Sequence, residues 1–194
     1  MNIQLSWDLF VVVFFTVIIS YSFIIGRDNT LKVILGTYVS AIAADALGNI
    51  FGNTITTSPV FMRLLKSMMI ESPEEAGIFI KVMFFVLFVI LFAVRGAFYV
   101  EVVRDRSAGV RLVLSILYAV FSAGLIISII LVFVSGVSFI GGSSQALNLA
   151  SNPTLNELVK QSEIIRIMLK YAYVWFFAPA LAFLLHSFYS TKKD

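Results

Sequence analysis

The sequence predicts an all-α fold, a polytopic bundle of about five transmembrane helices in a single membrane domain that covers residues 1–194. Of the 194 residues, 60% are hydrophobic and 13% are charged, and the mean hydropathy is +0.98. Soluble domains are about 45–50% apolar and about 25% charged. The apolar residues also fall into separate runs that approach the ~20 residues needed to cross ~30 Å of hydrocarbon.

Five apolar runs are predicted to span the membrane, and short polar or glycine-rich stretches separate them. The runs cover residues 9–25, 31–51, 77–100, 112–134 and 171–189. The first run ends at Gly26, and glycine is suited to the left-handed conformation that closes many helices. The fifth run contains Pro179, which is a candidate for a kink.

Two amphipathic segments, residues 58–71 and 155–170, are expected to lie on the outer membrane surface. Ser58 and Pro59 are typical of a helix start in the first segment. The second segment is expected to run without a break into the fifth span. Between the first segment and the third span, Ser72-Pro73-Glu74-Glu75 has the pattern of a capping box, in which a serine and a glutamate satisfy each other's amides.

The positions of lysine and arginine near the span ends indicate an orientation, because cytoplasmic loops carry more of them. One set of turns holds Arg27, Lys32, Arg95, Arg104, Arg106, Arg111, Lys192 and Lys193. The opposite set holds Arg63, Lys66, Lys160, Arg166 and Lys170. The bias favours the N-terminus outside and the C-terminus in the cytoplasm.

The sequence offers no recognised catalytic or cofactor motif. It contains no phosphate loop, no G-x-G-x-x-G, no H-E-x-x-H and no G-x-S-x-G. It has no cysteine and a single histidine, His186, so neither a metal site nor a thiolate nucleophile is expected. The basic residues are scattered between apolar runs, which argues against nucleic acid as a partner. The chain is therefore expected to be no enzyme, to hold no cofactor, and to have the lipid bilayer as its environment.

Small residues recur at every fourth position of the second span. They are Gly36, Ser40, Ala44, Gly48 and Gly52. Such a ladder lets another helix approach closely, and close packing is a main force for helix association in lipid. The ladder predicts packing within the chain, and a homo-oligomer seam or a groove for a partner membrane protein remains the alternative.

Asp45 and Lys81 are charged residues inside predicted spans, where an uncompensated charge costs several kcal/mol. At 1.5 Å per residue, Asp45 lies ~12 Å and Lys81 ~10 Å from the outer ends of their helices. The two charges should therefore share a level. One interpretation is an ion pair that locks the second span to the third, and the other is a part of an ion or proton pathway.

The order of features from Trp7 to Ser135 carries a family resemblance. The opening WDLFVVVFF is followed by a turn at Gly26-Arg27 that leads into the small-residue helix, and the basic turn VVRDRSAGVR precedes the fourth span. This order resembles the colicin V production protein (CvpA) family, small inner-membrane proteins of bacteria. The first turn departs from the family, since it reads GRDNTLK where the family carries R-G-x-x-R-E.

The resemblance implies a bacterial inner-membrane protein linked to bacteriocin export or envelope maintenance. Together with the small-residue ladder, it favours a non-enzymatic scaffold or accessory protein that works through helix contacts. The alternative is a small channel or ion-coupled transporter whose path includes Asp45 and Lys81. A carrier needs a hydrated cavity that reaches these charges, whereas a scaffold buries them away from water.

Overall fold

The fold is seen in a computed structural model, which describes residues 7–68, 70, 72–95, 108–140 and 153–190. Within these ranges every regular element is helical, as predicted, and no strand occurs. The helices are α1 (Trp7–Ile25), α2 (Arg27–Thr56), α3 (Pro59–Ser67), α4 (Pro73–Arg95), α5 (Ala108–Val134), α6 (Pro153–Gln161), α7 (Glu163–Lys170) and α8 (Ala172–Ser190).

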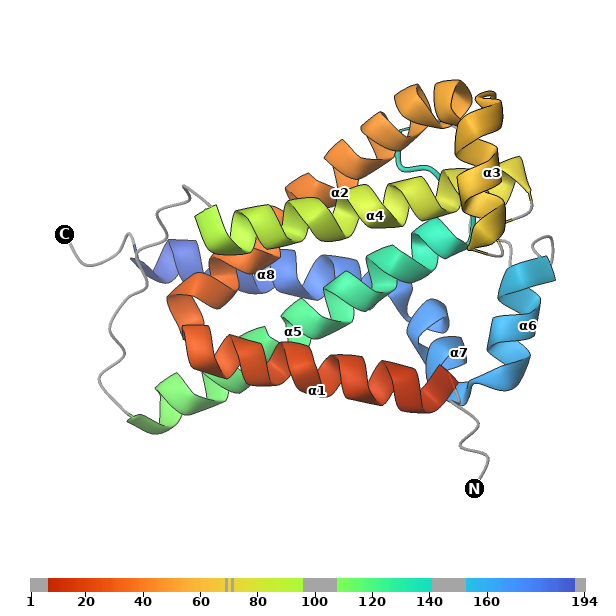
Figure 1. Ribbon diagram of the computed structural model, residues 1–194. Coiled ribbons are helices and arrows are strands. Elements are labelled where there is room, and N and C mark those ends of the chain that lie inside the picture. Colours follow the sequence, from red (N-terminus) through yellow and green to blue (C-terminus); the bar gives the residue numbers. More distant parts are fainter. Residues whose placement is uncertain (1–6, 69, 71, 96–107, 141–152, 191–194) are drawn as a thin grey trace.

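The five long helices run side by side and alternate in direction along the chain (Figure 1). We call the end of the bundle at which α1 begins the proximal end, and the opposite end the distal end. The short helices α3, α6 and α7 gather at the proximal end, while α8 ends at the distal end (Figure 1). The N-terminus of α1 and the C-terminus of α8 therefore lie at opposite ends of the bundle.

Four helices in the described ranges are long and apolar enough to cross a membrane. They are α1, α2, α4 and α5, over Trp7–Ile25, Arg27–Gly52, Pro73–Arg95 and Gly109–Val134. Helices α7 and α8 meet the same criterion only as a pair, and they are bent by 59° relative to each other. The apolar helices are those of a multi-pass membrane protein, with four spans, or five if the bent pair is one span.

The segment that precedes the last span differs from its prediction. We expected the amphipathic segment of residues 155–170 to run without a break into the fifth span, and the absence of a break is wrong. Ser162 has an extended backbone and its hydroxyl accepts the amide of Ile165 at 3.1 Å, so it ends α6 and begins α7. Tyr171 then separates α7 from α8 at the 59° bend. The C-terminal part of the predicted third span, residues 96–100, lies outside the described residues.

Local signals explain several helix boundaries. Gly26 has a φ of +80°, and α2 begins immediately after it, at Arg27. The capping box before α4 is confirmed, because the amide of Glu75 donates to the Ser72 hydroxyl at 3.1 Å and the amide of Ser72 donates to Glu75 Oε2 at 3.3 Å. Ser58 occupies the N-cap position of α3, with Pro59 after it, but its side chain makes no capping hydrogen bond.

Helix α5 forms the centre of the bundle. It packs against α1, α2, α4, α7 and α8, and 72% of its 18-residue apolar segment is buried, compared with 11% for the corresponding segments of α1 and α4. Its contact with α8 depends on Gly124, because a Cβ at that position would lie 2.1 Å from Cε3 of Trp175. The absence of a side chain at Gly124 therefore lets the Trp175 ring lie directly on α5.

Candidate functional site

The two buried charges meet between α2 and α4, the pair of helices with the most extensive contact in the described ranges. The Nζ of Lys81 lies 2.7 Å from Oδ1 of Asp45. The side chain of Asp45 is 0% exposed, and that of Lys81 is 13% exposed. The helix depths read from the sequence thus predicted a contact that the structure contains.

The small-residue ladder of α2 makes room for this pair. A Cβ at Gly48 would lie 2.3 Å from Cγ of Lys81, so the aliphatic stem of the lysine occupies the space that a side chain at position 48 would fill. Gly48 is three residues after Asp45, and residues three apart share a helix face. The glycine therefore lets Lys81 cross α2 and reach the carboxylate.

The other ladder residues behave unequally. A Cβ at Gly36 would lie 2.7 Å from Cβ of Phe92, which places α4 against the backbone of α2 at a second point. Ser40 and Ala44 are completely buried, at 0% exposed each. A Cβ at Gly52 would meet no described atom within 4 Å, so the close packing does not extend to this end of the ladder.

A third segment closes over the ion pair. After α5 ends at Val134, Gly136 has a φ of +74° and the chain turns back toward α2. The Ser138 hydroxyl and the amide of Ile140 both donate to Oδ2 of Asp45, each at 2.8 Å. The Asp45 carboxylate therefore accepts three hydrogen bonds, and one of them comes from an ammonium group, which strengthens it.

Side chains around Ser138 and Phe139 hold this segment in place. The side-chain Nδ2 of Asn49, one turn beyond Asp45 on α2, donates to the Ser138 hydroxyl at 3.1 Å. The Phe139 ring lies 5.6 Å from the Phe133 ring and 5.9 Å from the Phe176 ring, measured between centroids. The segment is thus fixed by polar contacts to α2 and by aromatic contacts to α5 and α8.

Sequence reasoning did not identify the partners of Asp45 other than Lys81. Ser138 and Ile140 lie in a stretch whose glycine and serine content indicates only a loop. Asn49 was also not singled out, although it follows Asp45 by one helical turn and could accordingly have been recognised as part of the same polar face.

A second polar junction lies at the proximal end, and sequence reasoning missed it too. Oδ1 of Asp8 accepts a hydrogen bond from the Ser162 hydroxyl and another from the amide of Ile164 at 3.4 Å. The carboxylate of the first turn of α1 thus binds the N-terminus of α7, where backbone amides are free of helical partners. This junction holds the start of α7 against the start of α1.

Three buried hydroxyls have no hydrogen-bond partner within the described part of the chain. They are those of Ser40 on α2 and of Ser122 and Ser128 on α5. The side chain of His186, the single histidine, is not among the side chains that the structure describes. No family model matches the chain, and comparisons with curated proteins and with solved structures likewise give no match.

Proposed function

We propose that the protein is a non-enzymatic scaffold or accessory subunit of the bacterial inner membrane, and that it works through contacts between helices. The observation that carries this proposal is the environment of Asp45. Lys81, Ser138 and the amide of Ile140 all donate hydrogen bonds to its buried carboxylate. A buried charge paired and hydrogen-bonded in this way joins α2, α4 and the segment after α5 into one rigid unit.

The orientation and the cellular role belong to the same proposal. The lysine and arginine bias supports a proximal end that faces the outside and a C-terminus in the cytoplasm. The resemblance of residues 7–135 to the CvpA family supports a role in bacteriocin export or envelope maintenance. The partner of such a scaffold is another membrane protein or a second copy of this chain.

One observation favours the alternative, a small channel or ion-coupled transporter that uses Asp45 and Lys81. The hydroxyls of Ser40, Ser122 and Ser128 are buried within the spans and lack protein partners in the described ranges. Buried hydroxyls without a protein partner commonly form hydrogen bonds to water, and a water-filled path through the bundle would supply that water. The two functions therefore differ in whether water reaches the middle of the bundle.

Single cysteine substitutions can separate the two functions, because the chain contains no cysteine of its own. Ser40→Cys and Ser122→Cys place a thiol at two of the buried hydroxyls, and Ser67→Cys places one at an exposed position on α3. The scaffold proposal expects a charged, water-soluble thiol reagent to label only Ser67→Cys. Rapid labelling of both buried positions would contradict it.

A flux measurement provides the second arm of this test. Purified protein in sealed vesicles is expected to give no flux of protons or of sodium or potassium ions beyond that of protein-free vesicles. A flux that is present in the wild type and abolished by Asp45→Asn would overturn the scaffold proposal and support the transporter. The two arms report independently, because labelling measures access of water and flux measures transport.

A further inference from the structure

Helix α8 has a weakened turn near its middle, at the proline that the sequence marks as a candidate kink. Pro179 has no backbone N–H, so the carbonyl of Trp175, four residues earlier, loses its donor within the helix. The next carbonyl, that of Phe176, accepts a hydrogen bond from the hydroxyl of Tyr38 on α2. The amide of Ala180, which bonds that carbonyl in a regular helix, faces the same hydroxyl. Pro179 and Tyr38 thus act on neighbouring bonds of one turn.

The contact of the Tyr38 hydroxyl with this turn has a physical reason. In lipid, backbone groups that a proline frees are satisfied by neighbouring helices, because hydrocarbon offers no donors or acceptors. Helices also bend at a proline or where a side chain enters the backbone ladder, and this turn has both features. The hydroxyl therefore supports the turn, and it is a contact that α8 loses if it bends away from α2.

The part of α8 before this turn is firmly held. The Trp175 ring lies directly on the backbone of α5, in the space that the absence of a side chain at Gly124 leaves open. The Phe176 ring lies 5.9 Å from the ring of Phe139, measured between centroids. Aromatic packing therefore fixes this part of α8 to α5 and to the segment that follows α5.

The part after the turn, residues 180–190, has weaker contacts and reaches the distal end (Figure 1). We call it the distal half of α8. Among residues 180–185, whose side chains the structure describes, none is buried, and the three leucines are 39–53% exposed. Lipid tails are as apolar as leucine, so these side chains gain nothing from one position of the helix over another. Ala182 and Phe183, which are partly buried against the core, and the hydroxyl of Tyr38 hold this half in place.

We propose that α8 hinges at Pro179 and that the Tyr38 hydroxyl is the latch that keeps the distal half docked on the bundle. In the docked position, which the structure contains, Ala182 and Phe183 cover part of the core. When the latch hydrogen bond breaks, the distal half swings toward the lipid and uncovers this part of the core, while the rest of α8 stays on α5. A bend of ~20°, at which a kink counts as sharp, moves Leu185, ~9 Å beyond the proline, by about 3 Å. The hinge does not depend on the scaffold function.

Pairs of nitroxide labels can measure this movement in the full-length protein in phospholipid vesicles, because the chain has no cysteine of its own. One pair joins Leu185→Cys in the distal half to Leu112→Cys on α5, both at exposed positions. The reference pair joins Val174→Cys, before the hinge, to the same Leu112→Cys. Double electron–electron resonance gives the distribution of distances within each pair.

Tyr38→Phe removes the latch hydroxyl and keeps the ring. We expect it to add a second population to the Leu185 pair, displaced by about 3 Å or more, and to leave the Val174 pair unchanged. The matched control is Tyr173→Phe, which removes the hydroxyl of an exposed tyrosine on α8 and should leave both pairs as in the wild type. Pro179→Ala restores the missing backbone donor, so Tyr38→Phe in that background should no longer produce the second population. If Tyr38→Phe does not fold, Tyr38→Leu lacks the same hydroxyl and takes its place.

Three results would overturn the proposal. Identical distributions in the wild type and in Tyr38→Phe would mean that the hydroxyl does not hold the distal half. A second population that persists with Pro179→Ala would show that the movement does not occur at the proline. Equal displacement of the Leu185 and Val174 pairs would mean that α8 moves as a whole, without a hinge.

Discussion

Asp45 is the residue whose surroundings explain most about this protein. A carboxylate in the hydrocarbon layer is costly, and its cost falls when a counter-charge and hydrogen-bond donors surround it. Lys81 supplies the charge at 2.7 Å, and Ser138 and Ile140 supply the two remaining donors. Because the buried carboxylate of Asp45 needs these partners, it favours a fold in which α2, α4 and the segment after α5 lie together.

The first prediction concerns the free energy of unfolding of the ion-pair variants in detergent. Removing one partner of a buried pair leaves the other uncompensated, which typically costs about 3–5 kcal/mol. Both Asp45→Asn and Lys81→Met should destabilise the protein, and Lys81→Met should do so more. The reason is that Asp45 is 0% exposed, whereas Lys81 is 13% exposed and has a flexible stem that can turn toward solvent.

The double variant decides whether the two residues act together. Asp45→Asn combined with Lys81→Met should recover much of the loss, because no charge is then left buried. Glu163 and Arg166 form a matched control, since they also lie 2.7 Å apart but are 70% and 58% exposed. The corresponding cycle at this surface pair should give a coupling of about 0–1 kcal/mol. Additive losses of stability at Asp45 and Lys81 would contradict an ion pair that holds α2 against α4.

At the scale of elements, the packing of α2 on α4 is governed by where side chains are absent. Gly36 brings the α2 backbone against Phe92, and Gly48 admits the stem of Lys81. In lipid no hydrophobic effect drives helices together, so such close van der Waals contact carries a larger share of the association. Two of the ladder positions thus hold the helices close, and Gly48 additionally positions the ion pair.

The second prediction compares alanine at three glycines of the same helix. Gly36→Ala and Gly48→Ala place a Cβ 2.7 Å and 2.3 Å from atoms of α4, so each should destabilise the protein by about 1–3 kcal/mol. Gly52→Ala meets no described atom within 4 Å and should be neutral or stabilising by up to about 1 kcal/mol, because alanine favours helix. Thermal unfolding in detergent measures all three.

The comparison among these variants contains its own control. All three substitutions add the same methyl group to the same helix, so helix propensity changes equally and only the neighbours differ. If alanine at Gly36, Gly48 and Gly52 changed the stability equally, the close approach of α4 to α2 would not depend on the ladder. The packing role of the ladder would then be wrong.

At the scale of the whole molecule, the arrangement separates two chemically different ends. The proximal end collects three short helices, the polar junction of Asp8 with Ser162, and the segment that closes over Asp45 (Figure 1). The distal end holds the tight turn at Gly26 and the end of α8. Helix α1 begins at one end and α8 finishes at the other, so the crossings number five if the bent pair of α7 and α8 is one span.

The third prediction tests this topology together with the proposed orientation. A fluorescent protein that matures only in the cytoplasm, fused after Asp194, should fluoresce, because five crossings from an outer N-terminus end inside. The same reporter fused to a chain cut after Ile140 should stay dark, because four crossings end outside. A dark full-length fusion with a bright truncated one would reverse the orientation, and equal brightness would remove α8 as a crossing.

The features that depend on neighbouring residues and on helix periodicity could be predicted from the sequence alone. Apolar runs of sufficient length located α1, α2, α4 and α5, and the turn at Gly26 and the capping box before α4 followed from local backbone chemistry. The level of Asp45 and Lys81 could be calculated because helix rise is constant and consecutive antiparallel helices usually pack together.

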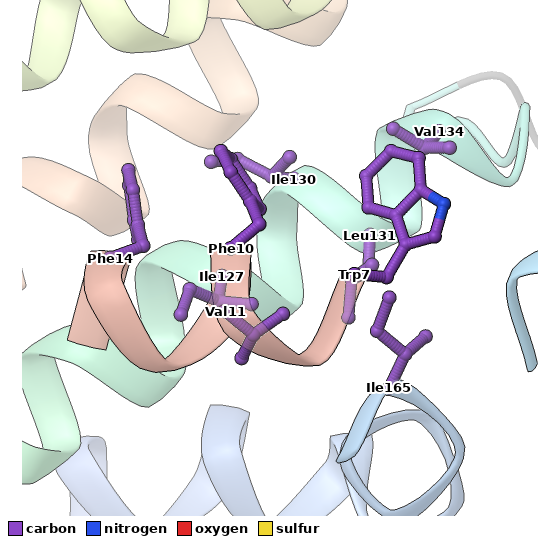
Figure 2. Close-up of a pocket in the computed structure, with 9 residues that line it drawn as sticks. All are labelled: Trp7, Phe10, Val11, Phe14, Ile127, Ile130, Leu131, Val134 and Ile165. Atoms are coloured by element: carbon purple, nitrogen blue, oxygen red, sulfur yellow. The ribbon is translucent and has the colours of Figure 1, made fainter. Parts of the chain in front are cut away.

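The distant segments that complete these features could be identified only from the fold. Ser138 reaches Asp45 across 93 positions of sequence, and Ser162 reaches Asp8 across 154. The break at Ser162, the bend at Tyr171 and the apolar pocket between α1, α5 and α7 (Figure 2) likewise depend on how α7 packs against α1 and α5. Periodicity and local propensity carry no information about such contacts, because they arise from the shapes of helices that are far apart in the chain.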